Sequence, residues 1–419
     1  MAIRSTVHQT GADAVTELLR LSPPDDGHRS VPCTCGRVAR YEGMRSRPIL
    51  TVVGWARIDR PYYHCLACHT GQFPADVELD IDKTDFSPGV RRMLAAVGGT
   101  APFAQGRDQI KLLASLEVTA KTVERTAESI GEDIEIRQQK DIQSTRQFRL
   151  PAVAGPSIPH LYIQMDGTQV FVVKTETEGR AGRIPGQFAR TRECKLGAVF
   201  TQATVDDQGR PVRDEDSTTY VGAIETAEEF GLRIYTEARN RGWDRATIRV
   251  VMGDGSHWIW NIADQHFPGA IQIVDLYHAR EHLWDLARKL HPADEAAQKR
   301  WLIRKLDWLE NGQIEKLTTA LRKRADTPQN AELAKAIRIE AEYFHSNRER
   351  MRYPDFRKKN LFVGSGVIEA GCKTVIGSRL KQSGMFWTVR GANAIISLRC
   401  CLLNGELEDY WAARRIACL

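Results

Sequence analysis

The sequence lacks an apolar run long enough to cross a membrane, and its start shows no charged-then-apolar leader. Both absences argue against a membrane-bound or exported protein and predict a cytoplasmic location. Internal repeats and long low-complexity tracts are also missing. What remains is a chain of 419 residues, 42% of them hydrophobic, which suffices for two or three domains with sizeable cores.

Cysteine occurs nine times, an odd number in a large chain without a leader, which argues against a disulfide framework and favours metal ligands or free thiols. Four of the nine stand in two close pairs separated by hairpin-like sequence: Cys33, Cys35, Cys65 and Cys68. Four thiolates in such pairs predict a structural Zn²⁺ site of the zinc ribbon type, in which the metal substitutes for a core too small to be stable alone. The first pair is one residue tighter than the usual Cys-x2-Cys knuckle. His64 or His69 remains an alternative for one of the sulfurs.

The segment 87–137 has helical character. Ser87 followed by Pro88 is a strong start signal for a helix. Helices are expected over 88–97, 102–116 and 119–130. The last two form a plausible helix-turn-helix, whose second helix would offer Lys121 and Arg125 to a DNA groove. Any compact three-helix unit has a similar pattern.

The net charge of +6 at pH 7 is spread unevenly. The segment 344–399 alone carries eleven basic and three acidic residues, interleaved with aromatic side chains. This is the pattern of a polyanion-binding surface, with a solvated charged face as the alternative. We expect DNA contacts from cations and one indole near the end of the segment: Arg379, Lys381, Trp387 and Arg390. Core packing is an equal alternative for Trp387.

The stretch Leu161–Val173 is β-branched and aromatic, with one carboxylate, Asp166, in its middle. It predicts a strand buried on both faces in the centre of a sheet. A buried carboxylate has to be paired, hydrogen-bonded or bound to a cation, and the adjacent Gly167 permits close approach to the backbone. A strand-end Asp-Gly turn is the alternative.

Two further strands end in aspartates. The run 247–253 leads to Asp254 and the run 271–274 leads to Asp275, with a short helix expected between them. Strand, helix and strand at this spacing form a βαβ unit, so the two strands should be parallel with both aspartates at their carboxyl ends. Ligands bind at the carboxyl ends of strands in open α/β sheets. With Asp166, the two aspartates therefore predict a cation site.

Between the first strand and the βαβ unit we expect a hairpin over 194–212 and then an amphipathic helix over 218–241. The resulting order of elements resembles the RNase H-like fold. In that fold the first acid lies on the first strand and the second follows the fourth strand. Asp166 and Asp254 fall at those places.

Nearly the whole chain, from the cysteine pairs to Arg399, resembles the DDE transposases of bacterial insertion sequences. The similar branch is the ISKra- and ISL-like one, which carries an N-terminal cysteine ribbon and is related to the Mutator-like and hAT transposases. Three elements carry the resemblance beyond the acids. They are Asp275-x2-His278, a following helical stretch rich in Leu, Ala, Lys and Glu, and Ser365-Gly-Val-Ile-Glu369-Ala-Gly-Cys-Lys373.

This resemblance implies roles for the acidic residues. Asp166, Asp254 and Glu369 would be catalytic and would hold two Mg²⁺ (or Mn²⁺) ions, with Asp166 bridging both. Asp275 competes with Asp254 for the second position. The accessory catalytic residues that the resemblance implies are Asp275, His278 and Lys373.

We therefore expect an α/β fold, with an RNase H-like mixed-sheet core that is interrupted by an all-helical insertion and preceded by a zinc ribbon and a small helical domain. The expected segments are an N-terminal arm (1–30), the ribbon (31–84), a helical DNA-binding domain (85–150), the first part of the core (157–283), the insertion (284–360) and the last part of the core with a DNA-binding tail (361–419). The Pro- and Gly-rich stretch 151–159 would be a linker.

The expected function is divalent-metal-dependent cleavage and strand transfer of DNA at insertion-sequence ends, by a bacterial, nucleoid-associated enzyme. Its partners would be transposon-end DNA, target DNA and further copies of the chain in a homodimer or larger assembly, with no membrane. One alternative is a nuclease or resolvase of the same fold without strand transfer. Another is a non-catalytic DNA-binding regulator derived from a transposase.

Overall fold

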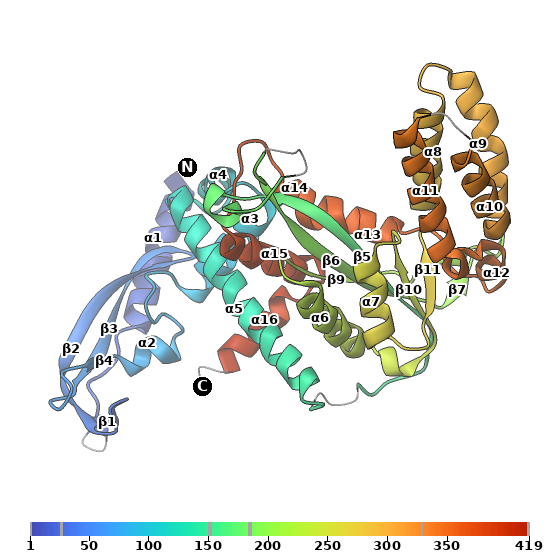
Figure 1. The fold of residues 1–419 in the computed structure, drawn as a ribbon. Helices are drawn as coiled ribbons and strands as arrows, with labels where there is room; N and C mark the ends of the chain where they lie inside the picture. Colours follow the sequence, from blue (N-terminus) through green and yellow to red (C-terminus); the bar gives the residue numbers. More distant parts are fainter. Residues whose placement is uncertain (1, 26–27, 150–152, 183–186, 328–329, 417–419) are drawn as a thin grey trace. The chain divides into compact units, whose positions relative to one another are not determined.

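The structure is a computed structural model that describes residues 2–25, 28–149, 153–182, 187–327 and 330–416. The chain forms two compact units, Met1–Ile134 with Gly405–Leu419 and Glu135–Asn404 (Figure 1). The six segments expected from the sequence are a finer division, and their boundaries stay a prediction. Residues 151 and 152, within the expected linker, lie outside the described part of the chain. None of the described helices is both long and apolar enough to cross a membrane.

The first unit contains a four-stranded antiparallel sheet in the order β1-β2-β3-β4. Its strands are β1 (Ser30–Pro32), β2 (Val38–Thr51), β3 (Gly54–His64) and β4 (Gly71–Gln72). The long hairpin of β2 and β3 carries one irregularity, between Tyr41 and Gly43. Ile49, Ile58 and Ile81 are buried together in a small apolar cluster. The stretches with strand character between the two cysteine pairs are thus confirmed as a hairpin.

The helices of the first unit include the three expected from the sequence. The helices of this unit are α1 (Ala2–Leu18), α2 (Pro74–Glu78), α3 (Pro88–Thr100), α4 (Phe103–Ala114), the first half of α5 (Ala120–Arg146) and α16 (Leu407–Ile416). The expected ones are α3, α4 and α5. α3 starts where the sequence predicts, because the Ser87 hydroxyl accepts a hydrogen bond from the Val90 amide and Pro88 takes the first helical position.

Helix α5 is longer than expected. The sequence predicted an end at Ile130, before Gly131, but the helix continues to Arg146. A glycine inside a helix costs only about 1 kcal/mol relative to alanine. Burial of Ile134 and Ile142 beyond it outweighs that cost.

The second unit is built on a five-stranded mixed sheet in the order β11-β10-β5-β6-β9. Its strands are β5 (Ile158–Phe171), β6 (Thr191–Gln202), β9 (Thr219–Ala223), β10 (Ala246–Gly253) and β11 (Ile271–Val274). β6 is antiparallel to both of its neighbours, whereas β10 is parallel to β5 and to β11. The expected hairpin is present as β6 followed by the small pair β7 (Thr204–Val205) and β8 (Pro211–Val212). The predicted parallel βαβ unit is confirmed, with α7 (His257–His266) between its strands.

One element was assigned wrongly from the sequence. The first residues of the helix expected over 218–241 form strand β9, which adds an edge to β6. Helix α6 (Ala227–Asn240) begins only after Thr226, whose hydroxyl accepts from the Glu229 amide in a capping box. The β-branched and aromatic run Thr219–Ala223 gains strand pairing that a helix would not give it.

Helices cover both faces of this sheet. A Cβ atom on Gly197 would lie 2.5 Å from Ile234 of α6, so this glycine makes room for α6 on one face. The preceding Leu196 points to the other face, where a Cβ atom on Gly371 of α13 (Gly366–Gly371) would lie 3.3 Å from it. Asp166 pairs with Leu196 in the register of β5 and β6 and therefore faces α13.

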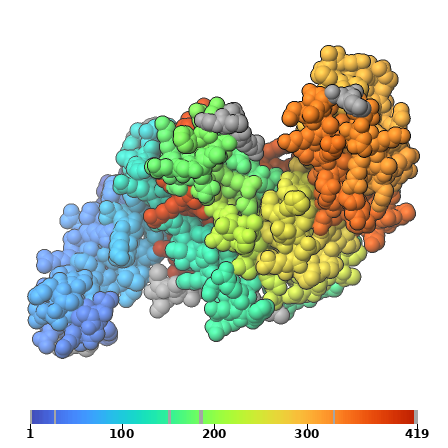
Figure 2. All heavy atoms as spheres, viewed as in Figure 1, coloured from blue at the N-terminus to red at the C-terminus, as the bar shows by residue number. Residues whose placement is uncertain are grey.

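A helical segment, 276–358, follows the last strand. It consists of α8 (Leu276–Leu290), α9 (Glu295–Glu310), α10 (Ile314–Ala325), α11 (Ala331–Ser346) and α12 (Tyr353–Lys358). α8, α9, α10 and α11 pack side by side, in gold and orange in Figures 1 and 2. Their buried side chains are continuous with the core of the sheet. The chain then returns to the sheet through α13 and α15 (Val389–Leu403).

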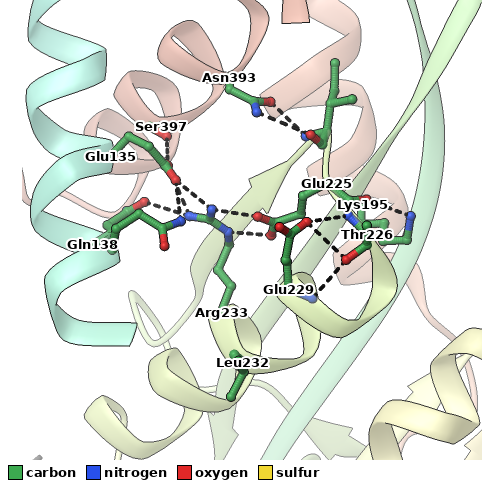
Figure 3. A network of polar contacts seen from close by, with 12 residues as sticks. Glu135, Gln138, Lys195, Glu225, Thr226, Glu229, Leu232, Arg233, Asn393 and Ser397 are labelled. Atoms are coloured by element: carbon green, nitrogen blue, oxygen red, sulfur yellow. Dashed lines mark hydrogen bonds and ion pairs between the residues drawn. The ribbon is translucent and has the colours of Figure 1, made fainter. Parts of the chain in front are cut away.

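A buried cation joins three helices of the second unit (Figure 3). Arg233 of α6 is 3% exposed and bonds Glu225 at 2.7 Å and Glu135 of α5 at 2.7 Å. Ser397 of α15 donates a further hydrogen bond to Glu135. Burial alone would raise the pKa of Glu135, but the Arg233 guanidinium holds it below its usual range. The two carboxylates and the guanidinium are thus mutually dependent.

We expect Arg233→Ala to lower the free energy of unfolding by about 3–5 kcal/mol, because it leaves two largely buried carboxylates unpaired. The pKa of Glu135 is depressed in the folded state, so the pair contributes above the usual carboxyl pKa of about 4.3 and its contribution is lost as pH falls. Denaturant unfolding at pH 7 and at pH 3.5 measures both effects. The difference between the two proteins should be smaller at pH 3.5 than at pH 7, because the contribution is lost as pH falls through the depressed pKa of Glu135.

The matched control is Arg239→Ala on the same helix. Arg239 pairs with Asp244, which is 57% exposed, at 3.2 Å. An exposed pair contributes about 1 kcal/mol or less. Equal losses in the two variants would contradict the assignment of Arg233 as the anchor of these helices.

Candidate functional site

The four predicted zinc ligands come together in the first unit. Cys33 Sγ lies 3.5 Å from Cys68 Sγ, and Cys35 Sγ lies 3.7 Å from Cys65 Sγ. All four sulfurs lie within 4.8 Å of one another. Tetrahedral ligation with Zn–S bonds of about 2.3 Å separates the sulfurs by about 3.8 Å, so the cluster has the size that Zn²⁺ requires.

Neither histidine alternative joins this group of four thiols. His64 Nδ1 lies 3.2 Å from a carboxylate oxygen of Glu42, and its ring is 6.0 Å from that of His69. The apolar cluster around the thiols is small, with Ala39 and Tyr63 as its other buried members. A metal would therefore supply cohesion that this core cannot.

The first two predicted acids lie at the same end of neighbouring strands. The parallel register of β5 and β10 pairs Gln164 with Met252. Asp166 and Asp254 each stand two residues further along. Because side chains alternate along a strand, both carboxylates are directed to the same face as Gln164 and Met252.

Asp275 extends this row by one strand. The parallel register of β10 and β11 pairs Gly253 with Val274, so Asp254 and Asp275 follow side by side. A Cβ atom on Gly253 would lie 2.6 Å from Ile259 of α7, so the residues after Gly253 and Val274 face away from α7. Three carboxylates at the carboxyl ends of adjacent parallel strands thus share one face.

The Asp166 carboxylate is half-buried and accepts two hydrogen bonds. The Gly167 amide donates to Oδ1 at 2.7 Å, and the Cys372 thiol donates to Oδ2 at 3.3 Å. Burial raises the pKa of Asp166, and the negative charge of Asp254 adds to the rise, while these hydrogen bonds and the nearby His278 oppose it. Two like charges held close together in a partly dry site favour a bound cation.

Asp254 and Asp275 differ in how far their oxygens are occupied. The Asp254 carboxylate accepts from the amide and the hydroxyl of Ser256, at 2.8 and 3.0 Å. The Asp275 carboxylate is fully buried and accepts four bonds, from the amides of Tyr277 and His278 and from the amide and hydroxyl of Ser365. A carboxylate has about four acceptor positions, so Asp275 has none left and Asp254 has two.

Asp275 thus caps α8 with one oxygen and fixes the start of α13 with the other. Glu369 lies in the first turn of α13 and is half-buried, and its carboxylate makes no hydrogen bond or ion pair within the described part of the chain. Ligand atoms of Asp275, His278 and Glu369 lie within 4.8 Å of one another, a group that could hold a metal ion. His278 Nδ1 is buried without a hydrogen-bond partner in the described structure.

Gln164 is a residue that the sequence analysis missed. It is fully buried on β5; its Oε1 accepts from the Ile368 amide at 3.0 Å, and its Nε2 donates to the Gly364 carbonyl at 3.4 Å. These bonds tie the segment that carries Glu369 to the strand that carries Asp166. A glutamine inside an otherwise apolar strand was the available signal, since a buried amide needs partners.

The remaining predicted residues fall into exposed and buried groups. Lys373 is exposed, one turn after Glu369. Lys121 and Arg125 are exposed on α5, where Lys121 Nζ lies 2.6 Å from a Glu124 oxygen, and Arg390 is exposed at the start of α15.

The segment around 379–387 is more buried than expected. Arg379 is fully buried, and burial, with the nearby Arg399, lowers its pKa to about 10. The Trp387 indole is 7% exposed and donates to the Leu380 carbonyl at 3.1 Å, which is core packing. Lys381 is exposed and donates to the Thr168 hydroxyl. DNA contacts by this group stay a prediction.

We expect the purified chain to hold about one zinc ion and Cys65→Ser to lose it, because three thiolates no longer close a tetrahedral shell. Elemental analysis after dialysis against a weak chelator measures the zinc content. Cys194→Ala is the control, since Cys194 lies on β6 of the second unit. Full zinc content in Cys65→Ser would contradict the proposed ligand set.

A second prediction separates Asp254 from Asp275. Asp275→Asn should destabilise the metal-free chain by about 1–3 kcal/mol, because an amide NH₂ would then face the Ser365 donors. Asp254→Asn should leave the metal-free unfolding midpoint nearly unchanged but remove the increase that Mn²⁺ produces in the wild type. Thermal unfolding with and without Mn²⁺ measures both. An undiminished Mn²⁺ effect in Asp254→Asn would assign the cation to the Asp275 group instead.

In comparisons with known proteins, no family model matches this sequence and no curated protein does. Among solved structures, the chain is similar to one from the "Drosophila P element transposase strand transfer complex". The identity is 8% and the TM-score 0.25, over 76% of this chain and 79% of that chain. The function therefore has to be inferred from the chain's own residues.

Proposed function

We propose that the chain is a DDE-type DNA transposase with an RNase H-like core, whose catalytic acids are Asp166, Asp254 and Glu369. The observation that supports the proposal is that Asp166 and Asp254 share one end of one sheet face, on which the helix that carries Glu369 packs. Asp166 and Asp254 follow neighbouring parallel strands, and the helix with Glu369 is tied to the first strand by Gln164.

The sheet topology supports the RNase H-like assignment. Numbered along the chain, its strands lie in the order 3-2-1-4-5, and the second strand alone is antiparallel to the rest. The resemblance noted in the sequence requires the first acid on strand one and the second acid after strand four. Asp166 on β5 and Asp254 after β10 meet that requirement.

The ligand chemistry also fits divalent cations. Carboxylate oxygens are the preferred ligands of Mg²⁺ and Mn²⁺, and Asp166, Asp254 and Glu369 retain acceptor positions that Asp275 lacks. When bound, two such ions would neutralise charge on the phosphate and acidify the attacking hydroxyl. The first attack would be made by water and the second by the freed 3′-hydroxyl, each in line with the bond that breaks.

The chain's own groups would orient the DNA phosphate. A ring nitrogen of His278 lies within 4.8 Å of the Glu369 carboxylate and could donate to a phosphate oxygen. Nδ1 is buried without a hydrogen-bond partner among the described residues, and a Glu281 oxygen lies 3.9 Å from it. The exposed Lys373 ammonium, one helical turn after Glu369, would contribute positive charge beside the same phosphate. Asp275 would act as a positioning residue rather than as a ligand.

Asp166→Asn should reduce Mg²⁺-dependent cleavage of DNA from the flanks of the gene to background, while binding of that DNA is retained. An amide cannot replace a bridging carboxylate. A gel assay of cleavage and a mobility-shift assay of binding measure the two effects. Asp207→Asn, in the exposed β7–β8 turn, is the control. Cleavage by Asp166→Asn at the wild-type rate would remove Asp166 from the site.

A strand-transfer assay distinguishes the transposase from a nuclease of the same fold. Its substrate is a precut end with a free 3′-hydroxyl, offered together with target plasmid. Joined products are the result expected of a transposase. Cleavage without joining would favour a nuclease or resolvase, and DNA binding with neither would favour a regulator.

A further inference from the structure

The turn that carries Asp254 is held from outside the sheet, by the helical segment 276–358. Tyr343 of α11 donates its hydroxyl to the main-chain carbonyl of Asp254 at 2.9 Å. The ring lies against the next residue, Gly255, where an added Cβ atom would be 2.6 Å from the ring carbon Cε2. Gly255 also has φ of 101°, a conformation that favours glycine. The turn thus follows the surface of the tyrosine closely.

The tyrosine itself is fixed on its other sides. His282 of α8 stacks on the ring with a centroid separation of 3.8 Å, and its Nδ1 lies 2.7 Å from a Glu340 carboxylate oxygen. Phe344 meets the ring edge-on at 5.2 Å. Burial raises the pKa of Tyr343, and the negative charges of Asp254, Asp275 and Glu340 raise it further. The hydroxyl therefore stays protonated and able to donate.

We infer that Tyr343 is a positioning residue for the second acid, through which the helical segment sets the geometry of the cation site. The inference rests on the proposed function, since it assigns Asp254 to that site. Asp254 is held at two places: Ser256 donates to its carboxylate oxygens, and Tyr343 donates to its main-chain carbonyl. Without the second restraint, the turn is free to rotate the carboxylate away from Asp166.

This role accounts for a polar contact that packing alone does not require. A phenylalanine at 343 would keep the stacking on His282 and the contact with Gly255. Only the hydroxyl donates to the Asp254 carbonyl, and this hydrogen bond links α11 to the acid itself. The hydroxyl is therefore expected to affect cation affinity more than stability.

The test is the affinity of the DNA-free chain for Mn²⁺, measured by calorimetry. We expect Tyr343→Phe to raise the Mn²⁺ dissociation constant about 2- to 13-fold, the range that one lost hydrogen bond of about 0.5–1.5 kcal/mol produces. The Mg²⁺ concentration for half-maximal cleavage should rise by a similar factor. The KM for DNA should not change, because Tyr343 is not placed against the substrate.

Tyr353→Phe is the matched control. Tyr353 is fully buried in the same helical segment, but its hydroxyl has no hydrogen-bond partner in the described structure. This variant removes the same atom from a similar environment and should leave the Mn²⁺ affinity unchanged. Equal weakening in both variants would mean that loosened packing is the cause and would overturn the inference.

Asp254→Asn separates this inference from the proposed function. Unchanged Mn²⁺ affinity in Asp254→Asn would show that the proposed site itself is wrong. Strong weakening in Asp254→Asn with wild-type affinity in Tyr343→Phe would keep the site and overturn the role of the tyrosine. Weakening in both, with Tyr353→Phe unaffected, is the result that the inference requires.

Discussion

The main constraint on the second unit is the repulsion between carboxylates that its sheet brings together, because the fold has to compensate it. Asp166 and Asp254 carry like charges on neighbouring strands, and burial makes their interaction stronger than it would be in water. A fold can tolerate such a pair only if hydrogen-bond donors, or a cation, compensate the charge. The hydrogen bonds that the carboxylates of Asp166, Asp254 and Asp275 accept serve that compensation.

The donors come from parts of the chain that are far apart in sequence. Cys372 donates to Asp166, and the Ser365 amide and hydroxyl donate to one oxygen of Asp275. Gln164 and Tyr343 bond main-chain groups rather than carboxylates. Gln164 accepts from the Ile368 amide, next to Glu369, and Tyr343 donates to the Asp254 carbonyl. Each of these bonds fixes an acid relative to the sheet, so the geometry of the site is a property of the whole unit. In the same way, Arg233 compensates the charges of Glu135 and Glu225 and connects α5, α6 and α15.

The first unit meets a different constraint, because its cysteine end has almost no apolar core. Ala39 and Tyr63 are the other buried members of the cluster around Cys33 and Cys65. Four thiols at the spacing of a tetrahedral metal site could hold an ion, and coordination would then replace packing. A carboxylate site in one unit and a thiolate site in the other would bind cations of different softness, so the two metals would not compete.

The sequence alone determined the elements with strong local signals. The Ser87–Pro88 helix start, the cysteine pairs and the parallel strands before Asp254 and Asp275 are each set by residues close together in the chain. It failed where tertiary pairing outweighs local preference: Thr219–Ala223 is a strand because β6 offers an edge, and α5 continues through Gly131 because its second half is packed. Only the tertiary structure decided that Asp275 has no acceptor left, that Trp387 is interior, and that Gln164 and Tyr343 hold the acids. Those facts depend on contacts between residues separated by up to about two hundred positions, and local periodicity carries no information on such contacts.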